Sequence, residues 1–512
     1  MNSSGLYTGK RFRKAIQHFL LGRAAQSLTS FILTLWLVRL LGASDYGAYM
    51  VLWGMVEMMV PLSSLGMLEA VRRFLPELAV RGEPEALKKF VAWMTLIRLA
   101  IMVVWTLVIA VFWVEITTWL GFSELQQNAT LLGLGLIITV LGFRYAAEML
   151  ECLLEQRWSQ LTHAFMPLGR LLGVAILVMI ESITLEQLLW VDLIVAFICF
   201  MLCEYFLIRK LQNLSGSGNL RVSAYEIANF AWHMAGVNLC RAVASMGALR
   251  ILVARVLGLE IAGMSAFLQQ FLIIIGRYLP ANLLANIIRP MLISRKVAGD
   301  YEIVGQGIAL LWKSNLLIIA LSMIAISIGG DEIIALVSGG RFTDAGLFML
   351  IMLFGLGTTS QGQLISMVME MLSYTRQLRF FSLLLLLTPV VVFFGVNWGL
   401  LGVISGIVLN AWIMNSIIMV WLKRQVNFIK LDWFGILRGI GLATFLAGIG
   451  LFIKDEFGVW LTLTVVILAY GLGLFIVKPL NSSDIALLNR GIRMPLRFLT
   501  LFAWNEKSNQ MR

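Results

Sequence analysis

Residues 17–41 read QHFLLGRAAQSLTSFILTLWLVRLL, an almost unbroken apolar stretch that follows the basic residues Lys10, Arg11, Arg13 and Lys14. The stretch is longer than the roughly 20 residues that an α-helix needs to cross a bilayer. It lacks a small-residue cleavage site and is too long for the core of a signal peptide. We therefore predict an uncleaved first transmembrane helix.

The whole chain has the same apolar character. Of its 512 residues, 60% are hydrophobic and only 13% are charged, and the mean hydropathy is +0.88. Soluble domains carry roughly 25% charged residues. A core of ordinary size cannot bury so much apolar surface, so lipid must be the solvent for much of it. The composition predicts an all-α integral membrane protein.

Apolar segments of spanning length recur about fourteen times along the chain. We predict spans near 17–41, 46–68, 91–113, 129–150, 159–180, 186–208, 228–257, 261–288, 308–329, 345–370, 377–395, 397–421, 433–453 and 457–477. The spans at 377–395 and 397–421 are separated only by a tight turn at 395–397.

Lysine and arginine alternate between the two sides of this map. One side receives the basic N-terminus, the loops that follow even-numbered spans and the C-terminal tail, whereas the opposite loops hold only Arg341 and Lys454. Basic loops remain in the cytoplasm, so we predict that both chain ends are cytoplasmic. The net charge of +12 is then a topology signal and a contact with anionic lipids, and nucleic acid is not an expected partner.

A linker divides the chain after the sixth span. It contains Ser215-Gly216-Ser217-Gly218. We predict an N-terminal lobe of six spans at 1–212, a cytoplasmic linker at 213–226, a C-terminal lobe of six spans at 227–425, two further helices at 426–480 and a cytoplasmic tail at 481–512.

The two lobes carry a short repeated pattern. A shift of 216 positions places Arg39, Leu41, Gly42 and Gly47 on Arg255, Leu257, Gly258 and Gly263. An even number of spans in each half predicts a parallel repeat about an axis along the membrane normal, one of the arrangements that secondary transporters use.

Several arginines lie well inside the predicted spans, where each costs roughly 2.5–3.5 kcal/mol on insertion scales. They are Arg23, Arg98, Arg170, Arg241, Arg250 and Arg277, and the acids at membrane depth are fewer, namely Glu57 and Asp192. Internal pairing cannot neutralise all these arginines. The surplus predicts a cationic chamber, which favours an anionic substrate.

Helical spacing indicates which polar residues share a face with these arginines. In the first span Ser27, Ser30 and Thr34 follow Arg23 at spacings of three and four, with Gln26 beside them.

The seventh and eighth spans carry similar stripes. Asn238 and Ser245 share the face of Arg241, and Gln270 shares the face of Arg277. Arg250 points to the opposite side of a straight seventh helix. We therefore give Arg250 a structural role, with Glu57 or a carbonyl as its partner.

Each polar residue also has a structural interpretation. Arg98 and Arg170 either line the chamber or have a structural role, in which they pair with helix-end carbonyls or extend to the interface. Glu57 is either an ion-coupling carboxylate or a charge partner of an arginine. Lys313 lies near a span end and is expected to pair with helix-end carbonyls or to reach the interface. The polar run at 358–363, which contains Gln361, predicts an unwound or cavity-lining segment. Close packing of small residues between helices is the alternative.

No motif of soluble chemistry stands out, so we expect no catalytic residue, cofactor or metal. Cys199 and Cys203 share a helical face, but no histidine or second cysteine pair joins them, which favours simple packing. The three histidines are scattered.

The opening of the chain resembles a known family. After the polar-striped first helix it reads Arg39-Leu40-Leu41-Gly42-Ala43-Ser44-Asp45-Tyr46-Gly47-Ala48-Tyr49, then Leu65-Gly66-Met67 and Arg72-Arg73-Phe74-Leu75-Pro76-Glu77. This is similar to the polysaccharide transporters, the Wzx-type oligosaccharide flippases of the MOP (MATE/MurJ) superfamily. The sequence-level likeness covers roughly the first eighty residues.

The resemblance implies a V-shaped pair of lobes around a cationic cavity in the bacterial inner membrane. It implies translocation of an undecaprenyl-pyrophosphate-linked oligosaccharide to the outer leaflet by alternating access, for surface polysaccharide biosynthesis. Membrane lipids, a polysaccharide polymerase and glycosyltransferases of the same pathway are the other implied partners. The residue pattern of the predicted spans, and not the resemblance, gives Arg23, Arg241 and Arg277 as candidates for contact with the anionic substrate.

Two other functions stay open. A membrane-embedded glycosyltransferase or polymerase usually needs a large outer loop, and the longest one here, near 329–345, is only moderately polar. A MATE-like multidrug antiporter is the second alternative. Drug-exporting relatives use a buried carboxylate in the first or seventh helix, where this chain has arginines and no acid at membrane depth.

Overall fold

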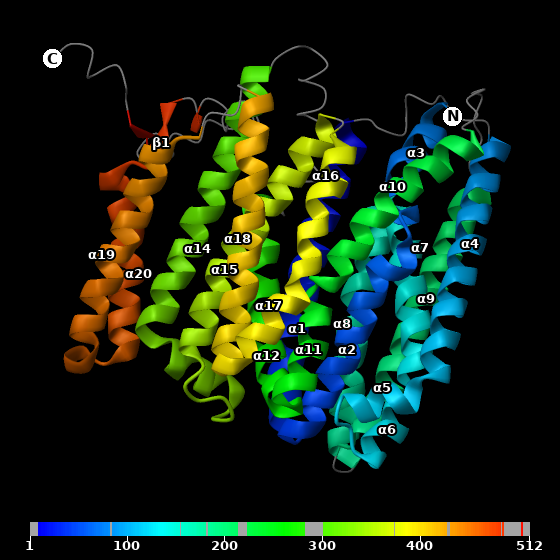
Figure 1. Ribbon diagram of the computed structural model, residues 1–512, viewed down its shortest axis with the longest axis horizontal. Helices are drawn as coiled ribbons and strands as arrows, with labels where there is room; N and C mark the ends of the chain where they lie inside the picture. Colours follow the sequence, from blue (N-terminus) through cyan, green and yellow to red (C-terminus); the bar gives the residue numbers. More distant parts are fainter. Residues whose placement is uncertain are drawn as a thin grey trace. The chain divides into compact units, whose positions relative to one another are not determined.

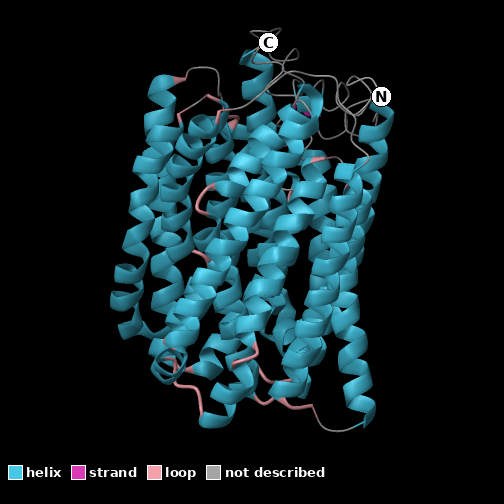
Figure 2. Ribbon diagram, turned by 90° about the vertical axis from the view of Figure 1, so that its right-hand side faces the viewer, coloured by secondary structure: helices cyan, strands magenta, loops and turns pink. Residues whose placement is uncertain are grey.

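The computed structural model describes residues 9–81, 84–153, 155–180, 183–212, 223–281, 301–372, 374–426, 431–482, 484–485 and 503–504. Almost all of this chain is helical, and the described strands are two short pieces near the C-terminus, β1 (Leu480–Asn481) and β2 (Ala503–Trp504), which pair in parallel. Figure 2 shows how completely helices dominate the fold. The predicted all-α membrane fold is confirmed.

The contacts divide the chain into two compact units. Unit 1 comprises Met1–Gln270 and Ser382–Val390, and unit 2 comprises Phe271–Phe381 and Val391–Arg512. The boundary falls later than the predicted linker because the helices after that linker pack on the early part of the chain. The two predicted lobes remain predictions, and each unit is described by itself.

Unit 1 contains the first half of the helices. They are α1 (Gly9–Leu40), α2 (Ala43–Ser64), α3 (Met67–Arg81), α4 (Pro84–Val111), α5 (Trp113–Trp119), α6 (Glu124–Thr130), α7 (Gly133–Cys152), α8 (Gln156–Ile180), α9 (Leu185–Gln212), α10 (Ala224–Val243), α11 (Met246–Leu257) and most of α12 (Leu259–Tyr278). Figure 1 labels them from blue to green. α1 packs on α8, α7 on α9, and α2 on both α10 and α11.

Two glycines that the repeat aligns lie against each other. A Cβ on Gly47 of α2 would stand 2.0 Å from the carbonyl oxygen of Leu259, and a Cβ on Gly263 of α12 would stand 3.2 Å from the Cα of Gly47. Only glycine permits so close an approach of two helix backbones. This close contact holds α12 against α2, and the parallel repeat itself stays a prediction.

α2 covers most of the second predicted span, and a sharp bend follows it. α2 and α3 meet at an angle of 59°, with Leu65 and Gly66 both at positive φ. A Cβ on Gly66 would lie 2.0 Å from the carbonyl oxygen of Ala231, so the backbone of α10 rests directly on the bend. Glycine is required here both for the left-handed conformation and for the close approach.

The seventh predicted span is broken, which corrects the phasing argument made from a straight helix. α10 ends at Val243, and the Ser245 hydroxyl accepts a hydrogen bond from the Ala248 N–H at 3.1 Å as the N-cap of α11. A serine cap satisfies an otherwise free backbone donor. The faces of Arg241 and Arg250 therefore cannot be compared by counting turns of one helix.

Unit 2 contains the remaining helices. They are the end of α12, then α14 (Tyr301–Ser338), α15 (Gly346–Met371), α16 (Thr375–Ser382), η2 (Leu383–Leu387), α17 (Thr388–Gly395), η3 (Val396–Trp398), α18 (Gly399–Gln425), α19 (Trp433–Phe457) and α20 (Val459–Val477), although η2 and part of α17 group with unit 1. α14 packs on α15, α19 and α20, and α15 packs on α18.

The chain folds back on itself at η3. Gly395 lies against Gly402, and Val391 lies against Gly406, so the end of α17 and the start of α18 run antiparallel. The predicted tight turn at 395–397 is confirmed. The single apolar stretch Arg376–Gln425 therefore makes two passages.

Twelve helices of the described chain are long and apolar enough to cross a membrane, or thirteen with the bent pair α2–α3 as one span. Their outward faces carry large apolar side chains, such as Val111 at 72% exposure and Ile476 at 82%. Apolar surface of this extent is stable only against lipid. The chain is a multi-pass membrane protein.

The orientation gives a direct prediction. Single cysteines at Glu124 and Asp455, both exposed and on the predicted outer side, should react with an impermeant maleimide on intact cells. Single cysteines at Ser223 and Gln425, exposed on the predicted cytoplasmic side, should react only after the membrane is opened.

The background for this experiment lacks the four native cysteines, three of which are buried. Labelling of Ser223→Cys on intact cells together with protection of Glu124→Cys would show that the orientation is the reverse of the predicted one.

Candidate functional site

Polar side chains inside unit 1 form separate clusters at several depths of the bundle. The most completely paired one surrounds Asp192 of α9, which is fully buried. Its carboxylate accepts hydrogen bonds from Arg170 Nε at 2.6 Å, from the Tyr49 hydroxyl at 2.8 Å and from Trp53 Nε1 at 3.0 Å. The Arg170 guanidinium also lies 4.6 Å from the centre of the Trp53 ring. Arg170 is thus neutralised inside the bundle.

A second cluster surrounds Arg250 of α11, which is also fully buried. Arg250 Nε donates to Gln269 Oε1 of α12 at 2.7 Å, and its Nη1 lies 3.3 Å from Glu57 Oε2 of α2. Glu57 is thus the partner that the sequence interpretation named for Arg250, and the structural role of Arg250 stays a prediction.

Arg144 of α7 is a residue that the sequence interpretation missed. It is half-buried within the candidate span Glu124–Cys152. The only signal in the sequence was a basic residue inside the predicted span at 129–150, six residues before its end. A residue so near a span end is readily taken for an interfacial one.

Arg98 of α4 lies in an apolar part of the core with 3% exposure. Its Nε and Nη1 have no hydrogen-bond partner among the described residues, and its guanidinium lies 5.5 Å from the centre of the Tyr145 ring. The Tyr145 hydroxyl is buried without a partner as well. This arrangement places Arg98 inside the bundle, away from any described carboxylate within ion-pair distance.

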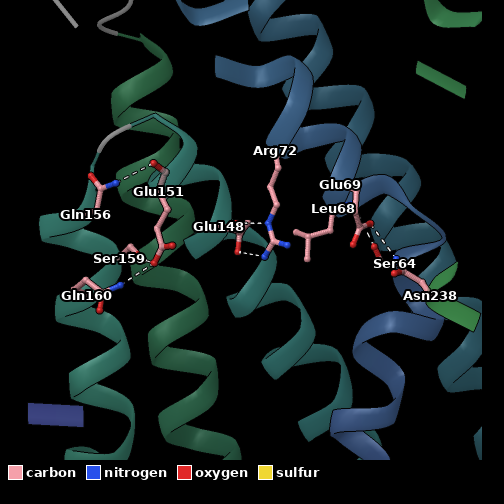
Figure 3. A network of polar contacts seen from close by, with 10 residues as sticks. All are labelled: Ser64, Leu68, Glu69, Arg72, Glu148, Glu151, Gln156, Ser159, Gln160 and Asn238. Atoms are coloured by element: carbon pink, nitrogen blue, oxygen red, sulfur yellow. Dashed lines mark hydrogen bonds and ion pairs between the residues drawn. The ribbon is translucent and has the colours of Figure 1, made fainter. Parts of the chain in front are cut away.

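Figure 3 shows a polar network that joins α8, α7, α3 and α10. Glu151 of α7 accepts hydrogen bonds from the Ser159 hydroxyl and from Gln160 Nε2, both at 2.8 Å. The Arg72 guanidinium of α3 binds Glu148 of α7 through Nε at 2.6 Å and Nη2 at 2.9 Å.

The same network continues to α10. Asn238 Nδ2 of that helix donates to Glu69 Oε2 of α3 at 3.0 Å. Glu148 and Glu151 lie at the end of the candidate span Glu124–Cys152, and Glu69 lies in the bent pair α2–α3. All three acids are paired inside unit 1, so internal pairing is more extensive than the sequence interpretation assumed, which is a correction.

The stripe on α1 has a mixed character. Ser27 is buried, while Arg23, Gln26 and Ser30 are half-buried, and the Thr34 hydroxyl donates to the Ser30 carbonyl oxygen at 2.9 Å. A threonine that bonds its own helix in this way needs no further partner. Gly22 lies against Gln160 of α8, which fixes this part of α1 on α8.

The predicted stripe of the seventh span is divided among different roles. Asn238 is 4% exposed and holds Glu69, Ser245 caps α11, and Arg241 is half-buried in the last turn of α10. Gln270 is half-buried in α12. The expectation that Asn238 and Ser245 share one open face is therefore wrong for these two side chains.

In unit 2 the polar run at 358–363 is helical, which corrects the predicted unwound segment. α15 continues through it, and Thr358 and Ser360 are buried. Asn415 Nδ2 of α18 donates to the Thr358 carbonyl oxygen at 2.6 Å, and Asn315 Nδ2 of α14 donates to the Ser360 hydroxyl. Interhelical hydrogen bonds of this kind hold membrane helices together.

Two further predicted residues lie in unit 2. Gln361 of α15 and Arg277 of α12 are each half-buried. The assignment of both to a substrate chamber stays a prediction.

Lys313 of α14 does not reach the interface, contrary to expectation. It is 1% exposed, and its Nζ donates to Asp432 at 2.5 Å and to Asp484 at 2.6 Å. Burial alone would raise the pKa of the Asp432 carboxyl, but hydrogen bonds from Lys313 and from the Gly435 N–H hold this pKa below its usual range. The two hydrogen bonds of Lys313 hold the segment after α20, which contains Asp484, against α14 and the start of α19.

This cluster predicts a pH-dependent contribution to stability. A carboxyl whose pKa is lower in the folded state stabilises the fold at pH values above its unfolded pKa of about 3.9, and the contribution is lost as the pH falls through the folded pKa. Asp432→Asn should therefore cost about 1.5 kcal/mol at pH 7, near the low end for hydrogen bonds to charged groups.

Thermal unfolding of the purified protein between pH 7 and pH 3 measures this effect. The difference between wild type and Asp432→Asn should shrink as the pH falls below about 4, the usual range of the aspartate pKa. A difference that stays constant over the whole range would show that the charge of Asp432 does not contribute.

Solved structures share this fold. The lipid II flippase MurJ in an inward closed conformation has a TM-score of 0.66 and 13% sequence identity, with 90% of this chain and 97% of that chain covered. An inward-facing multidrug resistance MATE family transporter of the MOP superfamily has a TM-score of 0.61 and 11% identity, with 81% and 98% covered. No protein-family model matches the sequence, and no curated protein matches it.

These likenesses define the class of fold. The chain has the fold of the MATE and MurJ transporters of the MOP superfamily. The sequence resemblance to that superfamily is therefore supported at the level of fold, and the finer resemblance to Wzx-type flippases passes to the proposal that follows.

Proposed function

We propose that this protein is a flippase that moves an anionic, undecaprenyl-pyrophosphate-linked oligosaccharide from the cytoplasmic to the outer leaflet of the bacterial inner membrane by alternating access. It is then a transporter of surface polysaccharide biosynthesis and not an enzyme. Arg23, Arg241 and Arg277 contact the pyrophosphate in this proposal, and Gln26, Ser27, Ser30, Gln270 and Gln361 offer polar contacts.

One observation carries the proposal: the helix that opens the chain bears an arginine at membrane depth and no acid. α1 holds Arg23 and lacks aspartate and glutamate throughout its length. α10 and α11 hold Arg241 and Arg250, and their single acid is Glu226 in the first turn of α10. A cation exporter needs carboxylates at such places, whereas an arginine binds phosphate oxygens through two parallel hydrogen bonds.

The multidrug antiporter is disfavoured by the same residues. Unit 1 does contain carboxylates, but Asp192 is fully occupied by Arg170, Tyr49 and Trp53, and Glu57 faces Arg250. A carboxylate so compensated has little charge left for a cationic drug.

A gene deletion tests the proposal against the polymerase alternative. The strain without this gene should lose surface glycan and accumulate the lipid-linked saccharide in the cytoplasmic leaflet, and the wild-type gene should reverse both effects. Loss of a polymerase would instead leave single repeat units at the surface. Normal surface glycan in the deletion strain would remove the proposed function.

A further inference from the structure

The buried guanidinium of Arg98 lacks the partner that its charge requires. Burying an unpaired charge costs several kcal/mol, yet Arg98 has 3% exposure and two nitrogens without a hydrogen bond among the described residues. The Tyr145 ring offers only a weak attraction at 5.5 Å. A second arrangement that gives Arg98 a carboxylate would therefore lie close in free energy to the one observed.

Glu69 is the candidate carboxylate for an ion pair with Arg98. Glu69 lies on α3, which packs on α4, the helix of Arg98, and its Oε2 is now held by the neutral amide of Asn238 at 3.0 Å (Figure 3). The bond from Asn238 is already charge-assisted, because its acceptor is a carboxylate. Arg98 would add a full positive charge opposite that carboxylate, and such an attraction is strong in a buried site. Arg98 is thus a competing partner for Glu69 once both are within reach.

The surrounding contacts show which helix would be released. On the same side of α3, Gly66 rests on the backbone of Ala231, and Arg73 lies 3.8 Å from Glu226. Both partners belong to α10. On another side of α3, Arg72 is held by Glu148 of α7 through two hydrogen bonds, so α3 keeps its place on α7 when its contact with α10 changes.

We propose that Glu69 is a switchable counter-ion that exchanges Asn238 of α10 for Arg98 of α4, and that this exchange releases α10 from α3. In one state Asn238 holds Glu69 and α10 is docked on the bend between α2 and α3. In the other state Glu69 pairs with Arg98, and α10 is free to move. The switch lies wholly within unit 1 and does not depend on which substrate is carried.

Three substitutions separate the two states. Asn238→Ala removes the docking hydrogen bond and favours the released state. Arg98→Met removes the charge that stabilises the released state, and Glu69→Gln still accepts a hydrogen bond from Asn238 but cannot form the ion pair, so both favour the docked state. Arg157→Met is the matched control, because it alters an exposed arginine of α8 that lies 4.9 Å from the ring of Trp158 on its own helix, and an exposed substitution away from α3 and α10 should have little effect.

Spin labels at Lys88 of α4 and Tyr225 of α10, both exposed, report the separation of these helices by double electron–electron resonance in purified full-length protein. Asn238→Ala should raise the ratio of long to short distances about tenfold, the effect of losing one hydrogen bond to a charged group. Arg98→Met and Glu69→Gln should leave only the short distance.

Thermal unfolding supplies the second measurement. Because Arg98 is unpaired in the docked state, Arg98→Met in the Glu69→Gln background should unfold at the same temperature as Glu69→Gln alone, or higher. Identical distance distributions in all variants, or a large loss of stability from Arg98→Met in that background, would overturn the switch. Neither result depends on transport, so each is distinct from a failure of the proposed flippase function.

Discussion

Arg23→Glu should abolish restoration of surface glycan in the deletion strain, whereas Arg23→Lys should keep part of it. In the proposed function, a pyrophosphate head enters from the cytoplasmic side and meets Arg23 on α1 first. Lysine keeps the charge but loses the two-pronged geometry, and glutamate repels phosphate. Arg23→Gln should lose activity as well, with the three variants ranked Lys, Gln, Glu.

The matched control is Arg255, which is exposed and lies 5.3 Å from the centre of the Trp119 ring. Arg255→Gln should restore surface glycan about as well as wild type. Membrane levels of each variant are compared by immunoblot. Wild-type activity in a well-expressed Arg23→Gln variant would remove Arg23 from the site, because an arginine that only packs its stem tolerates glutamine as well as lysine.

Asp192→Leu should have the largest effect on folding. The substitution leaves the Arg170 guanidinium without its carboxylate and removes the acceptor of Tyr49 and Trp53. Breaking a buried ion pair by removing one partner costs about 3–5 kcal/mol. We expect little folded protein after extraction in mild detergent.

The double variant Arg170→Met, Asp192→Leu should recover part of this loss, because it removes the buried charge together with its partner. Glu226→Ala, which removes the exposed partner of Arg73, should cost less than about 1 kcal/mol. The measurement is the fraction of monodisperse protein in size-exclusion chromatography after heating. Equal yields of Asp192→Leu and wild type would show that the cluster contributes little to stability.

The membrane fold could be predicted from the sequence because apolar length and the alternation of basic loops are local signals. The turn at 395–397 was visible for the same reason. The bend at Gly66 and the break before Ser245 were not, because each depends on what packs against the helix: the carbonyl of Ala231 rests on the first, and a serine cap begins the helix after the second.

The polar residues could be found from the sequence, but most of their partners could not. Arg250 and Glu57 were linked because both were obvious charges in spans, and the structure brings them within 3.3 Å. Arg170 and Asp192 could each be identified as charges inside spans. Only the structure shows that they bond to each other and to Tyr49 and Trp53. Helical spacing alone could not show that Asn238 faces Glu69, because the partner lies on another helix.

The polar run at 358–363 illustrates the same limit. A cluster of small polar residues within a span fits either an unwound segment or a helix that bonds to its neighbours. The decisive partners are Asn315 and Asn415, which lie on α14 and α18. Nothing in the run itself distinguishes the two outcomes.

The central claim is tested most directly in proteoliposomes that contain an undecaprenyl-pyrophosphate-linked short saccharide with a nitrobenzoxadiazole fluorophore on the sugar. Dithionite does not cross the membrane, so it quenches only the outer leaflet unless the lipid is flipped. The account predicts that wild-type protein exposes the inner-leaflet pool to dithionite and that Arg23→Glu does not. Wild-type vesicles that behave like protein-free ones, or that flip a fluorescent lipid with a cationic head equally fast, would contradict it.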